Sequence, residues 1–117
     1  MAITYHAIGG IVMVTKELLQ ISEKLKREIN PLQIYLFGSY AKGTQNPDSD
    51  YDIYLVVADD AGDNIELSQK AYKSLRGIRT TPVDIIVGNI SMFKSRQEKP
   101  TIEAELARTG VLLYAKP

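Results

Sequence analysis

Apolar residues along the chain recur with two periods, one typical of helices and one typical of short buried strands. Over residues 15–29 they recur every three or four positions, which predicts an amphipathic helix with Thr15 as its N-cap. A second helical pattern covers residues 65–78. Helix is also expected within residues 91–108, interrupted near Pro100, because proline breaks the hydrogen bonding of a helix interior.

Four short apolar runs predict strands. They are IYLF (34–37), DIYLVV (52–57), VDIIV (83–87) and VLLY (111–114). Strands that alternate with helices predict a small α/β (α+β) domain over residues 15–117, with helices packed against a mixed β-sheet. Residues 1–14 fit either an edge strand broken at Gly9-Gly10 or a leader, and a translation start at Met13 is a further alternative.

Composition and charge fit one globular domain without a general affinity for polyanions. The 117 residues, 44% of them hydrophobic, are sufficient for a single core. Fourteen basic and 14 acidic residues give no net charge, so we expect neither strong nucleic-acid binding nor attraction to an anionic membrane. The absence of cysteine excludes disulfides and thiolate metal sites, and no apolar run approaches the ~20 residues that span a bilayer. We therefore expect a cytoplasmic protein.

The segment GSYAKGTQNPDSDYD (38–52) carries the candidate chemistry, and a Walker A loop is its first interpretation. Gly38 and Gly43 have the required separation, but Thr44-Gln45 follow where lysine and Ser/Thr are needed. We also expect a strand after this loop, with no helix whose N-terminus would meet the phosphates. The Walker interpretation therefore fails.

A calcium loop is the second interpretation. Asp48, Asp50 and Asp52 match positions one, three and five of an EF-hand. Position six requires glycine and is Ile53, while position twelve requires glutamate and is Asp59. Asp52 also enters an apolar strand, which cannot wrap around an ion. We therefore exclude an EF-hand.

Strand geometry gives the third interpretation. Side chains alternate along a strand, so Asp50 and Asp52 share one face, and Asp84 of VDIIV converges on them if the two strands are neighbours. A carboxylate in so apolar a strand needs a partner, because burying an unpaired charge is costly. Like charges ~4 Å apart repel by several kcal/mol at a dielectric constant of ~20, and a divalent cation removes that repulsion. Carboxylate oxygens favour Mg²⁺ or Mn²⁺, and two such ions suit phosphoryl chemistry.

Simpler roles for the same residues remain open. Asp48 and Ser49 fit a turn after Asn46-Pro47, Asp50 alone can cap that turn, and Asp84 alone can pair with a lysine. The tyrosines fit core or sheet packing better than a partner surface.

With these residues assembled, the chain resembles the minimal nucleotidyltransferases of the DNA polymerase β-like superfamily. Their pattern is Gly-Ser, ten residues, Asp-x-Asp, and a third carboxylate on a later strand. Here it corresponds to Gly38-Ser39, Asp50-Tyr51-Asp52 and Asp84, and the likeness covers about residues 15–115. The resemblance implies a palm-like mixed sheet flanked by helices.

The resemblance also implies the roles of the site residues. Asp50, Asp52 and Asp84 would be catalytic and would bind two Mg²⁺ ions, and Asp84 would receive the proton of the acceptor. The nucleotide, expected to be ATP, would be held by five residues near the motif. They are Gly38, Ser39, Lys42, Gly43 and Ser49. Many relatives carry arginine where this chain has Tyr40 or Lys42, and lysine cannot make a bidentate phosphate contact.

Members of this family commonly pair with a small helical HEPN-domain protein. In such pairs the nucleotidyltransferase is the antitoxin and can inactivate its RNase toxin by adding AMP. The resemblance therefore implies transfer of AMP from ATP to a HEPN partner. Two alternatives stay open: an antitoxin that binds nucleotide and acts by contact alone, and an enzyme that modifies a small hydroxylated molecule.

Overall fold

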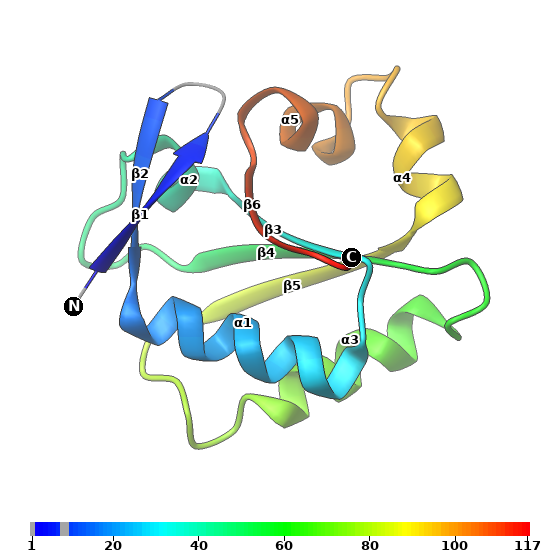
Figure 1. Ribbon diagram of the computed structural model, residues 1–117, viewed down its shortest axis with the longest axis horizontal. Helices are drawn as coiled ribbons and strands as arrows, with labels where there is room; N and C mark the ends of the chain where they lie inside the picture. The colour runs from blue at the N-terminus through cyan, green and yellow to red at the C-terminus, as the bar shows by residue number, and fades with distance from the viewer. Residues whose placement is uncertain (1, 8–9) are drawn as a thin grey trace.

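A mixed four-stranded β-sheet lies at the centre of the computed structural model (Figure 1). The structure describes residues 2–7 and 10–117, with side chains from Val14 onward. The strands are β3 (Gln33–Phe37), β4 (Tyr51–Val57), β5 (Val83–Asn89) and β6 (Val111–Ala115), in the order β5-β4-β3-β6. β3 pairs antiparallel with β4 and β6, whereas β4 and β5 run parallel. The predicted α/β class and the four predicted strands are confirmed.

Two layers of helices cover the two faces of this sheet. The helices of the described residues are α1 (Lys16–Ile29), α2 (Gly38–Lys42), α3 (Asn64–Ser74), α4 (Ile90–Arg96) and α5 (Ile102–Thr109). Figure 1 shows α1 and α3 on one side of the sheet and α4 and α5 on the other. The short helix α2 follows β3 directly.

Side chains alternate along β4 between the two faces of the sheet. The odd-numbered residues of 53–57 belong to the core under α1 and α3. Tyr54 points the other way and packs with Phe93 of α4 and Leu106 of α5. Asp52 lies two residues before Tyr54, so it shares the face of α4 and α5.

The first predicted helix is confirmed, and the second is shorter than predicted. The Thr15 hydroxyl accepts the Leu18 N–H at 3.1 Å and caps α1. Helix α3 ends at Ser74 because the turn that follows contains Gly77 with a φ of 82°, a left-handed conformation. Ile78, which the sequence pattern placed in the helix, lies in the loop and is 38% exposed.

The predicted interruption near Pro100 is confirmed, since α4 and α5 flank this residue. The strand expected after the loop is confirmed as β4, but the short helix α2, which begins at Gly38 inside the loop, was not predicted. Five residues are too few to show a helical period in the sequence. Gly43, with a φ of 72°, ends this helix instead of leading into one, so the Walker A motif stays excluded.

The N-terminal residues form an antiparallel pair of strands, β1 (Ala2–Ala7) and β2 (Gly10–Thr15), in a sheet of their own. The predicted break at Gly9-Gly10 falls partly on Gly9, which lies outside the described residues. The division into 1–14 and 15–117 stays a prediction. None of the helices in the described part of the chain has the length and hydropathy needed to cross a membrane.

Candidate active site

Three acidic residues predicted from the sequence lie together at one end of β4 and β5. The two strands pair in parallel with Asp52 directly opposite Asp84, so both side chains lie on one face. Asp50 lies immediately before β4 and two residues before Asp52. The pairing of neighbouring strands on which the expected convergence depends is therefore present.

The charges of these acids act on one another. Burial raises the pKa of Asp52, and the negative charges of Asp84, Asp50 and Glu105 raise it further. Mutual repulsion of this kind is expected where several carboxylates share a small volume. The ionisation of Asp52 is thus opposed by the charges of both other predicted acids and of Glu105.

Asp84 differs from its prediction in one respect. The sequence suggested a buried carboxylate that needs a partner, but the side chain is exposed. Val83 and Ile85 on either side of it are buried against the α1 and α3 face. Asp84 faces the opposite side of an edge strand, where it reaches solvent.

Gly38 is held close to Asp52 by the pairing of β3 with β4. Phe37, the last residue of β3, is opposite Asp52, and Gly38 begins α2 directly afterwards. A Cβ atom at Gly38 would overlap the Asp52 carboxylate, and the φ of 73° is also unfavourable for other residues. The absence of a side chain at Gly38 therefore lets the backbone of the Gly-Ser step approach the Asp52 carboxylate.

The three other residues predicted to bind nucleotide lie further along the segment. The Lys42 ammonium forms an ion pair with Glu105 of α5, with 2.7 Å between Nζ and Oε1. Gly43 ends α2, and the Ser49 hydroxyl accepts the Asn46 N–H at 2.9 Å, as a turn residue does. Lys42 is therefore paired with Glu105, whose negative charge also raises the pKa of Asp52. Ser49 lies in the turn before β4.

Helix α5 supplies two carboxylates that the sequence pattern did not single out. The first, Glu103, is buried and accepts the Tyr54 hydroxyl proton at 2.8 Å and the Arg96 Nε–H at 3.0 Å. Burial opposes its ionisation, yet these bonds hold the pKa of Glu103 below its usual value. Burial and the same carboxylate raise the pKa of Tyr54. The hydrogen bond between Tyr54 and Glu103 holds α5 against β4. Glu105 lies two residues after Glu103 on the same helix.

No local signal reveals Glu103 or Glu105 as part of this region. Two of their partners, Tyr54 and Lys42, lie far away in the sequence. Helical periodicity reports only that α5 has a buried face. The contact across the sheet depends on the tertiary fold.

A second group of contacts fixes the start of β4. Tyr51 is buried, and its hydroxyl lies 2.7 Å from the Thr15 hydroxyl at the start of α1. Its ring packs on Tyr40, with 4.6 Å between centroids. The Tyr51 N–H donates to the Pro82 carbonyl at 3.0 Å. Tyr51 is thus a packing residue, as predicted, and ties the residue between the two acids to the segment that leads into β5.

Comparison with known proteins decides the family. A family model described as polymerase beta nucleotidyltransferase matches residues 19–117. The chain belongs to this family. The family predicted from the sequence is confirmed.

The chain is also similar to the protein adenylyltransferase MntA of Shewanella oneidensis. The two are 48% identical over 60 residues, which cover 48% of this chain and 42% of MntA. The chain therefore matches less than half the length of that relative.

Solved structures share the fold. A candidate nucleotidyltransferase from Sulfolobus solfataricus has a TM-score of 0.60 at 24% identity, covering 86% of this chain and 79% of its own. A toxin–antitoxin structure with AMP-PNP has a TM-score of 0.53 at 30% identity, covering 87% and 75%. A mutant of the toxin–antitoxin MntA-HpeT has a TM-score of 0.51 at 30% identity, covering 84% and 73%.

The acids of this nucleotidyltransferase-family chain fit a hard divalent cation. Within the part of the chain that the structure describes, no group of three acidic, histidine or cysteine side chains is arranged so that it could hold a metal ion. Asp50, Asp52 and Asp84 nevertheless offer only carboxylate oxygens, which Mg²⁺ and Mn²⁺ prefer. The repulsion that raises the pKa of Asp52 is the effect that a bound cation would remove.

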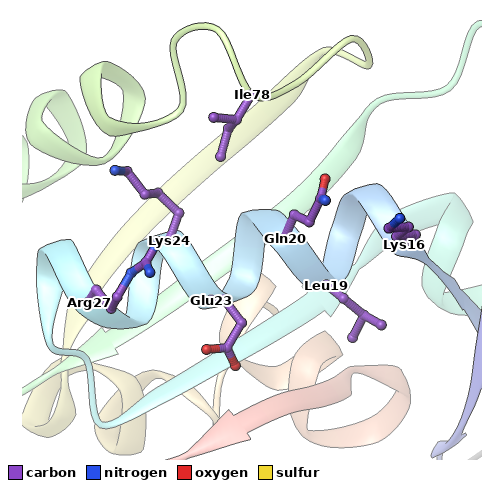
Figure 2. Close-up of a pocket in the computed structure, with 7 residues that line it drawn as sticks. All are labelled: Lys16, Leu19, Gln20, Glu23, Lys24, Arg27 and Ile78. Atoms are coloured by element: carbon purple, nitrogen blue, oxygen red, sulfur yellow. The ribbon is translucent and has the colours of Figure 1, made fainter.

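An open hollow of about 590 Å³ lies elsewhere, on the outer side of α1. Figure 2 shows Lys16, Lys24 and Arg27 along this helix, with Ile78 approaching from the loop before β5. Because α1 covers the sheet face opposite to that of Asp52, this hollow is separate from the acids.

Proposed function

We propose that this chain is a metal-dependent nucleotidyltransferase that transfers AMP from ATP to a partner toxin of the HEPN type. The observation that carries the proposal is the parallel register of Asp52 and Asp84, with Gly38 against the Asp52 carboxylate. Membership of the polymerase beta nucleotidyltransferase family supports the reaction class.

Five residues of the site have a role in this proposal. Asp50, Asp52 and Asp84 would hold Mg²⁺ or Mn²⁺, which neutralises phosphate charge and favours ionisation of the acceptor hydroxyl. Gly38 and Ser39 position the triphosphate beside Asp52. Asp84, which is exposed, receives the proton of the acceptor hydroxyl. The acceptor oxygen forms a bond to the α-phosphorus, the bond to the bridging oxygen breaks, and pyrophosphate leaves.

A protein acceptor suits the open position of Asp84. A side-chain hydroxyl on a folded partner can reach an exposed carboxylate on an edge strand. The similarity to a protein adenylyltransferase and to two toxin–antitoxin structures, one of them with AMP-PNP, supports the same choice. Antitoxin action by contact alone and modification of a small molecule are the alternatives. The cytoplasmic location stays a prediction.

Transfer of label from ATP to the partner tests the proposal. The purified chain is incubated with Mg²⁺ and ATP labelled in the α-phosphate, with and without the product of the neighbouring gene. We expect label on the partner, and no label when Mg²⁺ is chelated. A partner that binds but stays unlabelled with all four nucleoside triphosphates would favour the contact-only antitoxin.

The acids are tested by the double substitution Asp50→Asn and Asp52→Asn. Since metal ligation contributes several kcal/mol to such reactions, transfer should fall at least about 100-fold while the fold remains. The matched control is Asp48→Asn, which removes an exposed acid from the preceding turn and should leave transfer unchanged. Retained transfer in the double variant would contradict the metal assignment.

A further inference from the structure

In the sheet formed by the described residues, the strand that carries Asp84 has a neighbour on one side only. The sheet order β5-β4-β3-β6 places β5 at an edge, where β4 is its partner. Edge strands leave backbone groups unpaired and are less firmly held than central strands. The repulsion between Asp84 and Asp52 acts on this strand as well. An acid in this position needs other contacts to keep its register opposite Asp52.

One such contact comes from Tyr72 of α3. The N–H of Ile85, the residue after Asp84, donates to the Tyr72 hydroxyl at 2.8 Å. Tyr72 is 37% exposed, so its ring is only partly used for core packing. The hydroxyl supplies the acceptor that a further strand would otherwise provide.

A second contact comes from Glu17 in the first turn of α1. Its carboxylate accepts the Thr80 hydroxyl proton at 2.8 Å and the Thr81 N–H at 3.2 Å, and it also accepts the Thr80 N–H. These threonines precede Pro82 and β5, and the Pro82 carbonyl is itself bonded to Tyr51. The chain is therefore fixed on the approach to Asp84 as well as directly after it.

We propose that Tyr72 and Glu17 are positioning residues that hold Asp84 in register with Asp52. The proposal rests on the proposed function, since it gives these contacts a purpose only if the acids bind metal together. Neither side chain touches the reacting groups. Each acts through the backbone on one side of Asp84, and displacement of a metal ligand by a fraction of an ångström weakens both binding and catalysis.

The substitution Tyr72→Phe tests this role in the full chain, because it removes the acceptor and keeps the ring. We expect the Ile85 amide to exchange its hydrogen faster, and the apparent affinity for Mn²⁺ to fall roughly 10-fold. With the partner present, kcat should fall by a similar factor while KM for ATP changes less than about twofold. Glu17→Gln should change Mn²⁺ affinity in the same direction, by a smaller factor.

Matched controls separate positioning from a general loss of structure. Tyr114→Phe makes the same change on β6, at the opposite edge of the sheet, where the Tyr114 ring contacts Lys26. Glu23→Gln makes the same change as Glu17→Gln on an exposed residue of α1. Both controls should bind Mn²⁺ as the wild type does.

A double-substitution cycle provides the decisive measurement. If Tyr72 acts through Asp84, then Tyr72→Phe weakens Mn²⁺ binding in the wild type but not in an Asp84→Asn background. Equal losses in both backgrounds, or a Tyr72→Phe variant indistinguishable from Tyr114→Phe, would overturn the inference and leave the proposed function intact. A wild-type chain that neither binds Mn²⁺ nor transfers AMP would overturn both.

Discussion

At Gly38 two constraints act on the same Cα atom. The backbone takes a φ of 73°, and a Cβ atom would overlap the Asp52 carboxylate. Gly43 at the other end of α2 has nearly the same φ of 72°, but a Cβ atom there would meet nothing within 4 Å. A comparison of substitutions at the two glycines therefore distinguishes the cost of the left-handed backbone conformation from the cost of crowding the Asp52 carboxylate.

We expect Gly38→Ala and Gly43→Ala each to lower the free energy of unfolding by about 1–2 kcal/mol, the cost of a left-handed conformation. Gly38→Ala should in addition displace Asp52 and abolish most nucleotidyl transfer, whereas Gly43→Ala should lower transfer much less, because a Cβ atom there does not crowd the acids. Chemical denaturation and the label-transfer assay measure the two effects. Similar transfer by both variants would show that the approach of Gly38 to Asp52 is not needed.

Asp52 and Asp84 were predictable because each lies in an apolar strand pattern, and Asp50 because it precedes Asp52 by two residues. Their convergence followed from period-two alternation once the strands were assumed to be neighbours. The exposure of Asp84 could not be predicted in this way, because it depends on β5 being an edge strand. Glu103 and Glu105 were missed for a similar reason, since their contacts arise only when α5 docks on β4.

At the scale of elements, α1 and the loop before β5 are joined by one carboxylate. Burial opposes the ionisation of Glu17, but the hydrogen bonds from Thr80 and Thr81 outweigh it and lower its pKa to about 2, from 4.5. A lowered pKa in the folded state means that ionised Glu17 stabilises the fold above pH 4.5. That contribution is lost as the pH falls from 4.5 towards 2.

Glu17→Gln should therefore destabilise the protein mainly near neutral pH. Because the carboxylate is at the surface, where water screens its interactions, we expect a loss of about 1 kcal/mol at pH 7. The difference from the wild type should shrink as the pH approaches 2. Urea denaturation at pH 7 and pH 3 measures it, with Glu23→Gln as control. A difference that grows in acid would contradict the assignment.

Helix α5 is joined to β4 by the buried bond between Tyr54 and Glu103. Tyr54→Phe would leave the Glu103 carboxylate without one of its donors, at a cost of about 1–3 kcal/mol. Tyr35→Phe is the matched control, because both tyrosine rings pack on Phe93, with centroids 5.6 and 5.5 Å away. Thermal and chemical unfolding compare the two variants. Equal stability would mean that Arg96 alone satisfies Glu103.

Strand positions were the easiest part of the fold to predict. Continuous apolar runs placed all four central strands within two residues of their ends. The helix α2 was missed because its five residues have no room for a period, and α3 was overextended because Gly77 ends helical geometry before the apolar pattern stops. At the end of α3, backbone conformation at glycine therefore overrides hydrophobic spacing.

At the scale of the whole molecule, the sheet separates two kinds of surface. The face under α1 and α3 carries the larger hydrophobic core, and the face under α4 and α5 carries the acids at its open end. With no net charge on the whole chain, attraction of ATP and a partner depends on the local arrangement at that end. Transfer should therefore respond more to substitutions near β4 and β5 than to charge changes elsewhere.

The parallel strands β4 and β5 and the helix α3 between them are synthesised before α5, which bears on the order of folding. Asp50, Asp52, Tyr72 and Asp84 all belong to one continuous stretch, which leaves the ribosome before residues 102–109 of α5. The pairing of Asp52 with Asp84 closes a shorter loop than the contact of Tyr54 with Glu103, which joins residues 49 positions apart. We therefore expect β4, α3 and β5 to be able to pair before α5 docks on the sheet.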